Sequence, residues 1–176
     1  GWFLSLHAFA LGELGDHDRA RRLIERSLAL APRNGHGAHA MAHLLYESDR
    51  PKQTIAFLSE WLPEYPAAAQ FHVHLHWHLA LALLRAGEAD AAWRVYRAAV
   101  HAFADRDGPR LNVLSDSAAF LWRSELSGRV APPTFWQDVV AFGSRWFPQP
   151  GLAFADVHVA MALAAVGERA MLASLA

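Results

Sequence analysis

The spacing of small and apolar residues is the feature that most constrains this chain, because it recurs at a fixed interval. Ala8 and Ala42 lie 34 positions apart. The same interval separates four further pairs: Leu11 and Leu45, Ile24 and Leu58, Leu28 and Leu62, and Pro32 and Pro66. In each interval two apolar, helix-like stretches flank a short polar turn. A single helix hairpin of this length cannot bury both of its faces, so the pattern predicts several stacked hairpins.

The same signature continues at longer displacements. The trio Ala8, Leu11 and Gly15 corresponds to Ala80, Leu83 and Gly87, which lie 72 residues later. A displacement of 80 residues then leads to Ala160, Leu163 and Gly167, and a more divergent pair of helices lies in between. We therefore predict a single domain over residues 1–176 with about five hairpins. Their expected ranges are roughly 1–34, 35–68, 69–108, 110–148 and 152–176. Because both ends read as uncapped helix, we expect the chain to be cut from a longer protein at each end.

The periodicity inside the units predicts an all-α fold. Apolar residues recur at positions i, i+3, i+4 and i+7, which is typical of an amphipathic helix. Alternating β-branched runs of the kind that form strands are absent from the sequence. Alanine recurs at Ala8, Ala20, Ala42 and Ala80, where the backbones of paired helices are expected to approach closely.

Composition excludes several classes of protein. The chain has no cysteine, so it has neither disulfides nor thiolate metal ligands. Its formal charge of −1 lacks the basic excess of a nucleic-acid binder. No run of about 18 apolar residues occurs, so we expect no membrane-spanning segment. A cysteine-free chain fits a reducing compartment, and we expect a cytoplasmic protein, although such a chain is stable anywhere. The sequence leaves the oligomeric state open.

The 34-residue period, the small residues at helix crossings and the closing prolines Pro32 and Pro66 resemble the tetratricopeptide repeat. The resemblance covers most of the chain and is strongest in the first two units. It implies antiparallel helix hairpins stacked in a right-handed superhelix, which is an α-solenoid. In such folds the first helix of each hairpin lines a concave groove.

A narrower set of segments is similar to the tetratricopeptide repeat protein 38 family. The segments are 39–43 (HAMAH), 74–78 (HLHWH), 116–123 (DSAAFLWR) and 156–158 (DVH). In the segment that corresponds to 74–78, that family usually carries Asn and an aromatic residue where this chain has Leu75 and His76. The resemblance implies a tetratricopeptide-like solenoid, and it implies no established activity.

Histidine is over-represented, with 11 residues, and most of them fall on the expected first helices. His39 and His43 form an i, i+4 pair, and so do His74 and His78. Such a pair places two imidazoles on one helix face, close enough to share one metal ion. The candidate groove or ligand-binding residues are His39, His43, His74, Trp77, His78, Asp116, Arg123, Asp156 and His158. By contrast, we expect His17 and His101 to be ordinary surface residues.

Three readings of these groups stay open. Buried His–Asp hydrogen bonds could fix the register of the hairpins. The groove could bind a protein or peptide partner, or a small ligand, which makes an interaction scaffold the leading function and argues against an enzyme. Alternatively, the His/Asp cluster could form a metal-binding or enzymatic module, with a divalent metal as cofactor and with His39, His43, His74 and His78 as candidate ligands.

Overall fold

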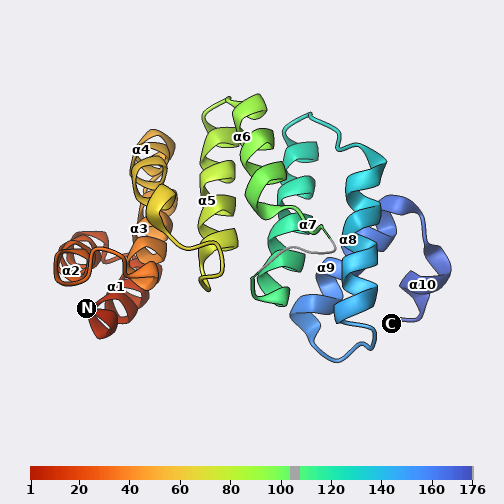
Figure 1. The fold of residues 1–176 in the computed structure, drawn as a ribbon, viewed down its shortest axis with the longest axis horizontal. Coiled ribbons are helices and arrows are strands. Elements are labelled where there is room, and N and C mark those ends of the chain that lie inside the picture. Colours follow the sequence, from red (N-terminus) through yellow and green to blue (C-terminus); the bar gives the residue numbers. More distant parts are fainter. Residues whose placement is uncertain (104–107, 176) are drawn as a thin grey trace.

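A computed structural model describes residues 1–103 and 108–175 of the chain (Figure 1). Within these residues the chain forms ten α-helices and no strand. The helices are α1 (Trp2–Glu13), α2 (His17–Leu30), α3 (Gly35–Glu47), α4 (Pro51–Trp61), α5 (His72–Arg85), α6 (Ala89–Val95), α7 (Arg110–Leu126), α8 (Pro133–Trp146), α9 (Ala153–Val166) and α10 (Arg169–Ala173). The all-α prediction is confirmed.

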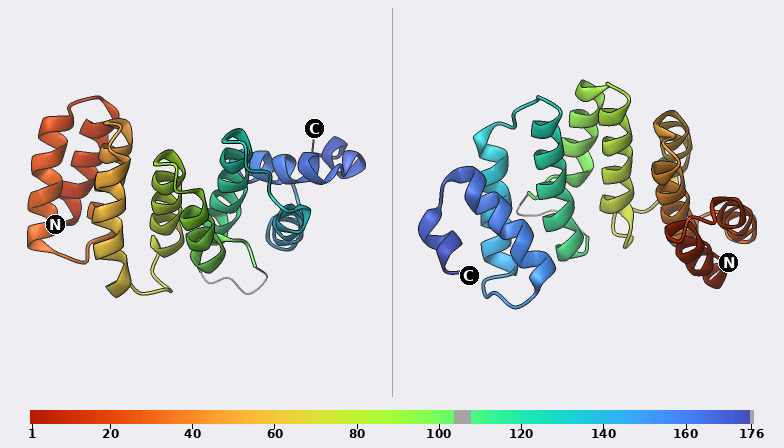
Figure 2. Two further views of the ribbon diagram at one scale, coloured as in Figure 1. Left: turned by 90° about the horizontal axis from the view of Figure 1, so that it is seen from above. Right: turned by 180° about the vertical axis from the view of Figure 1, so that it is seen from behind.

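The helices pack largely as sequential pairs, α1 with α2 through α9 with α10. The pairs follow one another along the longest axis, from α1 and α2 at one end to α9 and α10 at the other (Figures 1 and 2). The odd-numbered helices α1, α3, α5, α7 and α9 also pack against one another in this order. The expected third and fifth hairpins include residues 104–107 and 176, which lie outside the described residues.

One turn geometry joins the two helices of every pair. A residue with positive φ ends the first helix: Gly15, Asp49, Gly87, Gly128 and Gly167. The following residue donates its N–H to the carbonyl five positions earlier, as Asp16 does to Leu11 at 2.9 Å. This is the Schellman arrangement, which satisfies the carbonyls left open at a helix C-terminus. The glycines that the sequence comparison aligned thus share one backbone conformation.

Replacing Gly15 by alanine is expected to lower the free energy of unfolding by about 1–2 kcal/mol, because φ is +85° there and a Cβ is disfavoured. No atom lies within 4 Å of the added Cβ, so the cost comes from the backbone alone. Gly12→Ala is the matched control, since this residue is helical and its new Cβ meets only Ala20 at 3.9 Å. It should raise stability by about 0.5–1 kcal/mol. Urea unfolding of both variants checks the pair, and a Gly15→Ala protein as stable as wild type would contradict it.

The core depends on alanine at the helix crossings. Ala8, Ala20, Ala42 and Ala80 are all fully buried, as the close approach of paired helices requires. Buried apolar residues form a smaller cluster around Ile24, shared by α1, α2 and α3, and a larger one that extends from α3 to α9. Helix α3 contributes to both clusters, so it is the element that connects the first pair with the rest of the molecule.

The prediction that His101 lies on the surface is wrong. Helix α6 continues into a π-helical turn, η2 (Tyr96–Val100), which ends where the N–H of His101 bonds to the carbonyl of Tyr96 at 2.8 Å. The imidazole of His101 is completely buried, with Nδ1 at 2.7 Å from the hydroxyl of Tyr96 and Nε2 at 2.9 Å from Asp138. The prediction rested on the position of His101 outside the expected first helices, and that position did not reveal the contacts with Tyr96 and Asp138 that hold the ring in the core. His17 is half-buried near Ser48.

No helix in the described part of the chain is long and apolar enough to cross a membrane.

Candidate metal centre

Four imidazoles meet where α3 and α5 lie side by side (Figure 1). His39 and His43 lie one turn apart on α3, and His74 and His78 lie one turn apart on α5. One ring nitrogen from each residue belongs to a set whose members all lie within 4.8 Å of one another. Nε2 of His39 and Nε2 of His74 lie 3.1 Å apart. The structure therefore places four nitrogen donors around one point.

These spacings suit a transition-metal ion after a small adjustment. A tetrahedral ion with metal–nitrogen bonds of about 2.0–2.1 Å requires nitrogens about 3.3 Å apart. The His39–His74 pair is already at this separation, and wider pairs in the set need shifts of at most about 1.5 Å, which rotation of an imidazole about its side-chain torsions supplies. The four residues could therefore hold one metal ion.

Burial disfavours the charged form of His39 and of His78, and so favours the neutral form that binds metals. Burial, together with the neighbouring His74, His43 and His36, lowers the pKa of His39 to about 2. Burial likewise places the pKa of His78 well below its usual range, with added effects of His74, His43 and His39. A positive charge on His39 or His78 would be poorly hydrated and would lie next to the other imidazoles. Neutral imidazole is the ligand form, so this environment prepares the site at neutral pH.

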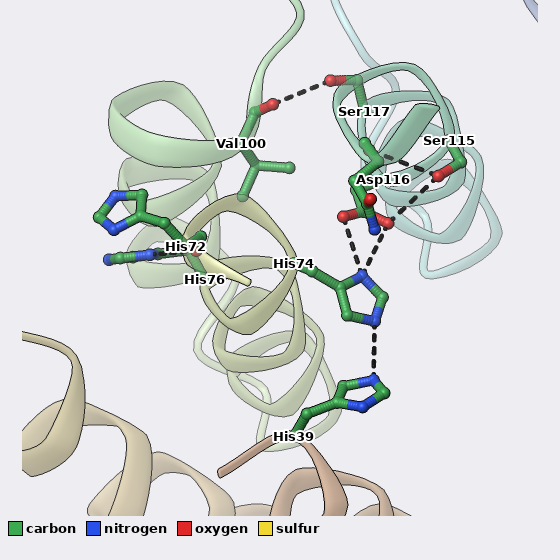
Figure 3. Close-up of polar contacts among 9 residues, drawn as sticks. His39, His72, His74, His76, Val100, Ser115, Asp116 and Ser117 are labelled. Atoms are coloured by element: carbon green, nitrogen blue, oxygen red, sulfur yellow. Dashed lines mark hydrogen bonds and ion pairs between the residues drawn. The ribbon is translucent and has the colours of Figure 1, made fainter. Parts of the chain in front are cut away.

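A buried carboxylate orients His74. Asp116 on α7 accepts hydrogen bonds from Nδ1 of His74, at 2.9 and 3.1 Å, and Nε2 of the same ring faces His39 (Figure 3). The hydroxyl of Ser115 supports the carboxylate at 3.4 Å. Burial raises the pKa of Asp116, and the hydrogen bond from His74 opposes this shift. An imidazole held in this way by a carboxylate presents a fixed lone pair at Nε2, which is the usual outer-shell arrangement of metal-bound histidine.

A second carboxylate holds His43. Glu13, the last residue of α1, lies 3.3 Å from Nδ1 of His43. Burial lowers the pKa of His43, whereas the nearby carboxylates of Glu13 and Glu47 raise it. Both i, i+4 pairs thus include one imidazole whose Nδ1 is engaged by a carboxylate.

Aromatic rings surround the cluster. Phe9 and Phe71 stack on His39 with ring centroids 5.4 and 4.9 Å apart, and Trp77 stacks on His74 at 5.2 Å. Nε2 of His78 is buried and has no hydrogen-bond partner among the described residues. A buried nitrogen without a partner costs free energy, and the residue that carries it is one of the four clustered histidines.

The other predicted site residues divide into two groups. The guanidinium of Arg123 lies 5.6 Å from the ring of Trp77, so both residues are close to the cluster. His158 on α9 lies near enough to Asp116 to lower its pKa, while its own Nδ1 is 2.6 Å from the carbonyl of Phe154. Asp156 makes no hydrogen bond to the cluster among the described residues. Its carboxylate accepts a hydrogen bond from the N–H of Gly151 and closes the loop before α9. Asp156 has a local role there.

Sequence reasoning did not find Glu13, Phe9 or Phe71. Phe9 and Glu13 share one face of α1 at i, i+4 spacing, and that face is turned toward α3. This spacing was the available signal, but a Phe–Glu pair is common on helices and indicates no ligand by itself. His72 and His76 form a third i, i+4 pair on α5, with ring centroids 4.3 Å apart, on the side away from the cluster (Figure 3).

Fold and site together define an all-helical protein of paired helices with a four-histidine cluster that could hold a metal ion. No protein-family model matches the chain, and no solved structure resembles it significantly.

Proposed function

We propose that this protein binds one divalent transition-metal ion, Zn²⁺ in the first place, through His39, His43, His74 and His78. One observation carries the proposal: Nε2 of His78 is buried without a partner among the described residues, and His78 belongs to a group of four imidazoles whose ligand nitrogens, one from each ring, all lie within 4.8 Å of one another. A purely structural histidine would be expected to bond to a backbone or carboxylate group, and this nitrogen does not. A metal ion supplies the missing partner.

The chemistry of the donor set favours this class of ion. Imidazole suits Zn²⁺, Cu²⁺, Fe²⁺ and Ni²⁺, whereas Mg²⁺ and Ca²⁺ prefer oxygen ligands. All four donors are imidazole nitrogens, and the two carboxylates, Glu13 and Asp116, contact Nδ1 of His43 and Nδ1 of His74. These carboxylates do not contact the ion, but their negative charges lie one imidazole ring away from it and partly offset its positive charge.

Elemental analysis of the purified protein tests the proposal. We expect one Zn²⁺ per chain after dialysis against excess zinc and removal of unbound ion. His78→Ala is expected to lose the ion, because it removes the most deeply buried ligand. His7→Ala is the matched control, since His7 is an exposed histidine on α1 and belongs to no cluster of ligands.

The result that would overturn the proposal is equal metal content in wild type and His78→Ala, or none in either. If no metal binds and His78→Ala only lowers the melting temperature, the histidines are structural. Retained metal in His7→Ala shows that the loss in His78→Ala is specific to the cluster.

We further propose that the paired helices are tetratricopeptide-like hairpins of an α-solenoid related to the tetratricopeptide repeat protein 38 family. The 34-residue spacing, the recurring positive-φ turn and the buried alanines support this reading. A second candidate function, an interaction scaffold for a protein or peptide partner, is favoured by one observation. Large apolar side chains are exposed on α1 and on α9, at Trp2 and Phe3 and at Phe154 and Val157. Exposed apolar groups of this size are typical of interaction surfaces.

A further inference from the structure

The four imidazoles of the cluster are held unequally. His78 is only 5% exposed, and the side chain of His74 is 17% exposed. His39 lies between the stacked rings of Phe9 and Phe71. The side chain of His43 is 28% exposed, which is more than for His74 or His78. One side of the cluster is therefore closer to solvent than the others, and His43 is the ligand on that side.

The two carboxylates that contact the cluster also differ in exposure: the one beside His74 is buried, and the one beside His43 is exposed. Asp116, which holds His74 at 2.9 Å, has a side chain that is 5% exposed and belongs to the interior of α7. Glu13, which holds His43 at 3.3 Å, is 49% exposed and is the last residue of α1. An exposed ion pair contributes little free energy, so the Glu13 contact restrains His43 weakly. His74 cannot move without breaking a buried hydrogen bond, whereas His43 can swing outward.

We infer that His43 is an exchangeable ligand of the proposed metal ion and that a small anionic ligand takes its place. The inference rests on the proposed function. In the exchange, the coordinate bond from Nε2 of His43 to the metal breaks, and a lone pair of the incoming anion forms the new bond. The ion keeps His39, His74 and His78, and no electron or proton needs to be transferred. Three protein ligands with one open position are the arrangement of zinc sites that act on a bound ligand, whereas four fixed ligands are typical of structural sites.

The groups beside the cluster favour an anion as the incoming ligand. Arg123 is exposed, and its guanidinium lies over Trp77, which in turn stacks on His74. None of the described carboxylates pairs with Arg123, which donates only to the carbonyl of Ala119 at 3.3 Å. The indole Nε1 of Trp77 is also a buried donor without an acceptor among the described residues. Arg123 and Trp77 therefore place a cation and an N–H without an acceptor among the described residues next to His74, and both favour an anion over a neutral or cationic ligand.

Cobalt substitution with azide as the probe anion tests the inference. We expect the Co²⁺ form of the wild-type chain to change its visible absorption when azide is added, because the coordination of Co²⁺ changes. His43→Ala should still bind one Co²⁺, with a loss of affinity no larger than the about 10- to 100-fold that follows removal of an outer-shell partner. Its spectrum should respond to azide at lower concentrations than that of wild type. His43→Gln keeps the volume and a donor for Glu13, so it repeats the test if the alanine variant folds poorly.

The remaining variants separate the outcomes. His78→Ala should lose Co²⁺, His7→Ala should match wild type, and Arg123→Met should weaken the azide response several-fold without changing Co²⁺ affinity. If His43→Ala and His43→Gln lose Co²⁺ as completely as His78→Ala, all four histidines are fixed ligands. The inferred ligand exchange is then contradicted, whereas the proposed metal site is supported. An azide response in His43→Ala that equals the wild-type response also contradicts the exchange. If wild type binds neither Co²⁺ nor Zn²⁺, the proposed function itself fails.

Discussion

Zinc is expected to raise the melting temperature of the metal-free protein by about 8–16 °C when free Zn²⁺ exceeds its dissociation constant about a thousandfold. At this excess, binding to the folded state alone adds about 4 kcal/mol to the free energy of unfolding. Each kcal/mol raises the melting temperature by about 2–4 °C in a domain of this size. The unfolded chain cannot match this binding, because His39 and His74 are 35 residues apart and meet only when α3 packs against α5.

Thermal unfolding followed by circular dichroism checks this result, with Mg²⁺ and His78→Ala as controls. Mg²⁺ prefers oxygen ligands and should leave the melting temperature unchanged. The variant lacks one buried ligand and should show a small shift or none. A zinc-induced shift of the same size in wild type and in His78→Ala would place the stabilising ion elsewhere on the molecule.

Metal-free protein should lose up to about 3 kcal/mol of stability between about pH 7.5 and pH 5.5. The folded-state pKa values of His39 and His78 lie below the ordinary value of 6.5, mainly because of burial. The unfolded chain therefore binds protons at these residues as the pH falls through about 6.5, whereas the folded chain does not, and each histidine then costs about 1.4 kcal/mol per pH unit. The contribution of these two histidines to the free energy of unfolding is present in full well above pH 6.5 and is lost as the pH falls below that value. Protonation of Asp116, whose pKa is raised, offsets part of the loss at lower pH.

Urea unfolding at the two pH values measures this loss, and His39→Gln provides the control. Glutamine removes the lowered pKa of His39, one of three lowered values beside those of His43 and His78, and keeps a polar side chain. The pH dependence should therefore shrink by roughly a third to a half. A free energy of unfolding that stays constant between the two pH values would mean that the histidines do not form a close cluster. A decrease of equal size in wild type and in His39→Gln would assign it to other groups.

Much of the fold could be predicted from local pattern. The i, i+3, i+4 periodicity and the turn residues predict helices joined in hairpins, and the positive φ at Gly15, Gly87 and Gly167 explains why these glycines align. Asp49 occupies the same position in the second pair with φ at +53°, which the comparison of glycines alone did not reveal. His101 was predicted wrongly, because its position outside the first helices does not reveal that Tyr96 and Asp138 hold its ring in the core. The metal-binding role of the four histidines stays a prediction.

The sequence by itself determined which imidazoles share a helix face, since i, i+4 spacing places His39 beside His43 and His74 beside His78 wherever the helices lie. Only the tertiary structure decided that the two faces meet and that Asp116 and Glu13 contact Nδ1 of His74 and of His43. It also decided that Nε2 of His78 is buried with no hydrogen-bond partner in the part of the chain that the structure describes. The physical reason is the range of the interactions. Helical periodicity depends on neighbours within about four residues, whereas the register of α3 against α5 results from the packing of alanines and large side chains throughout the core.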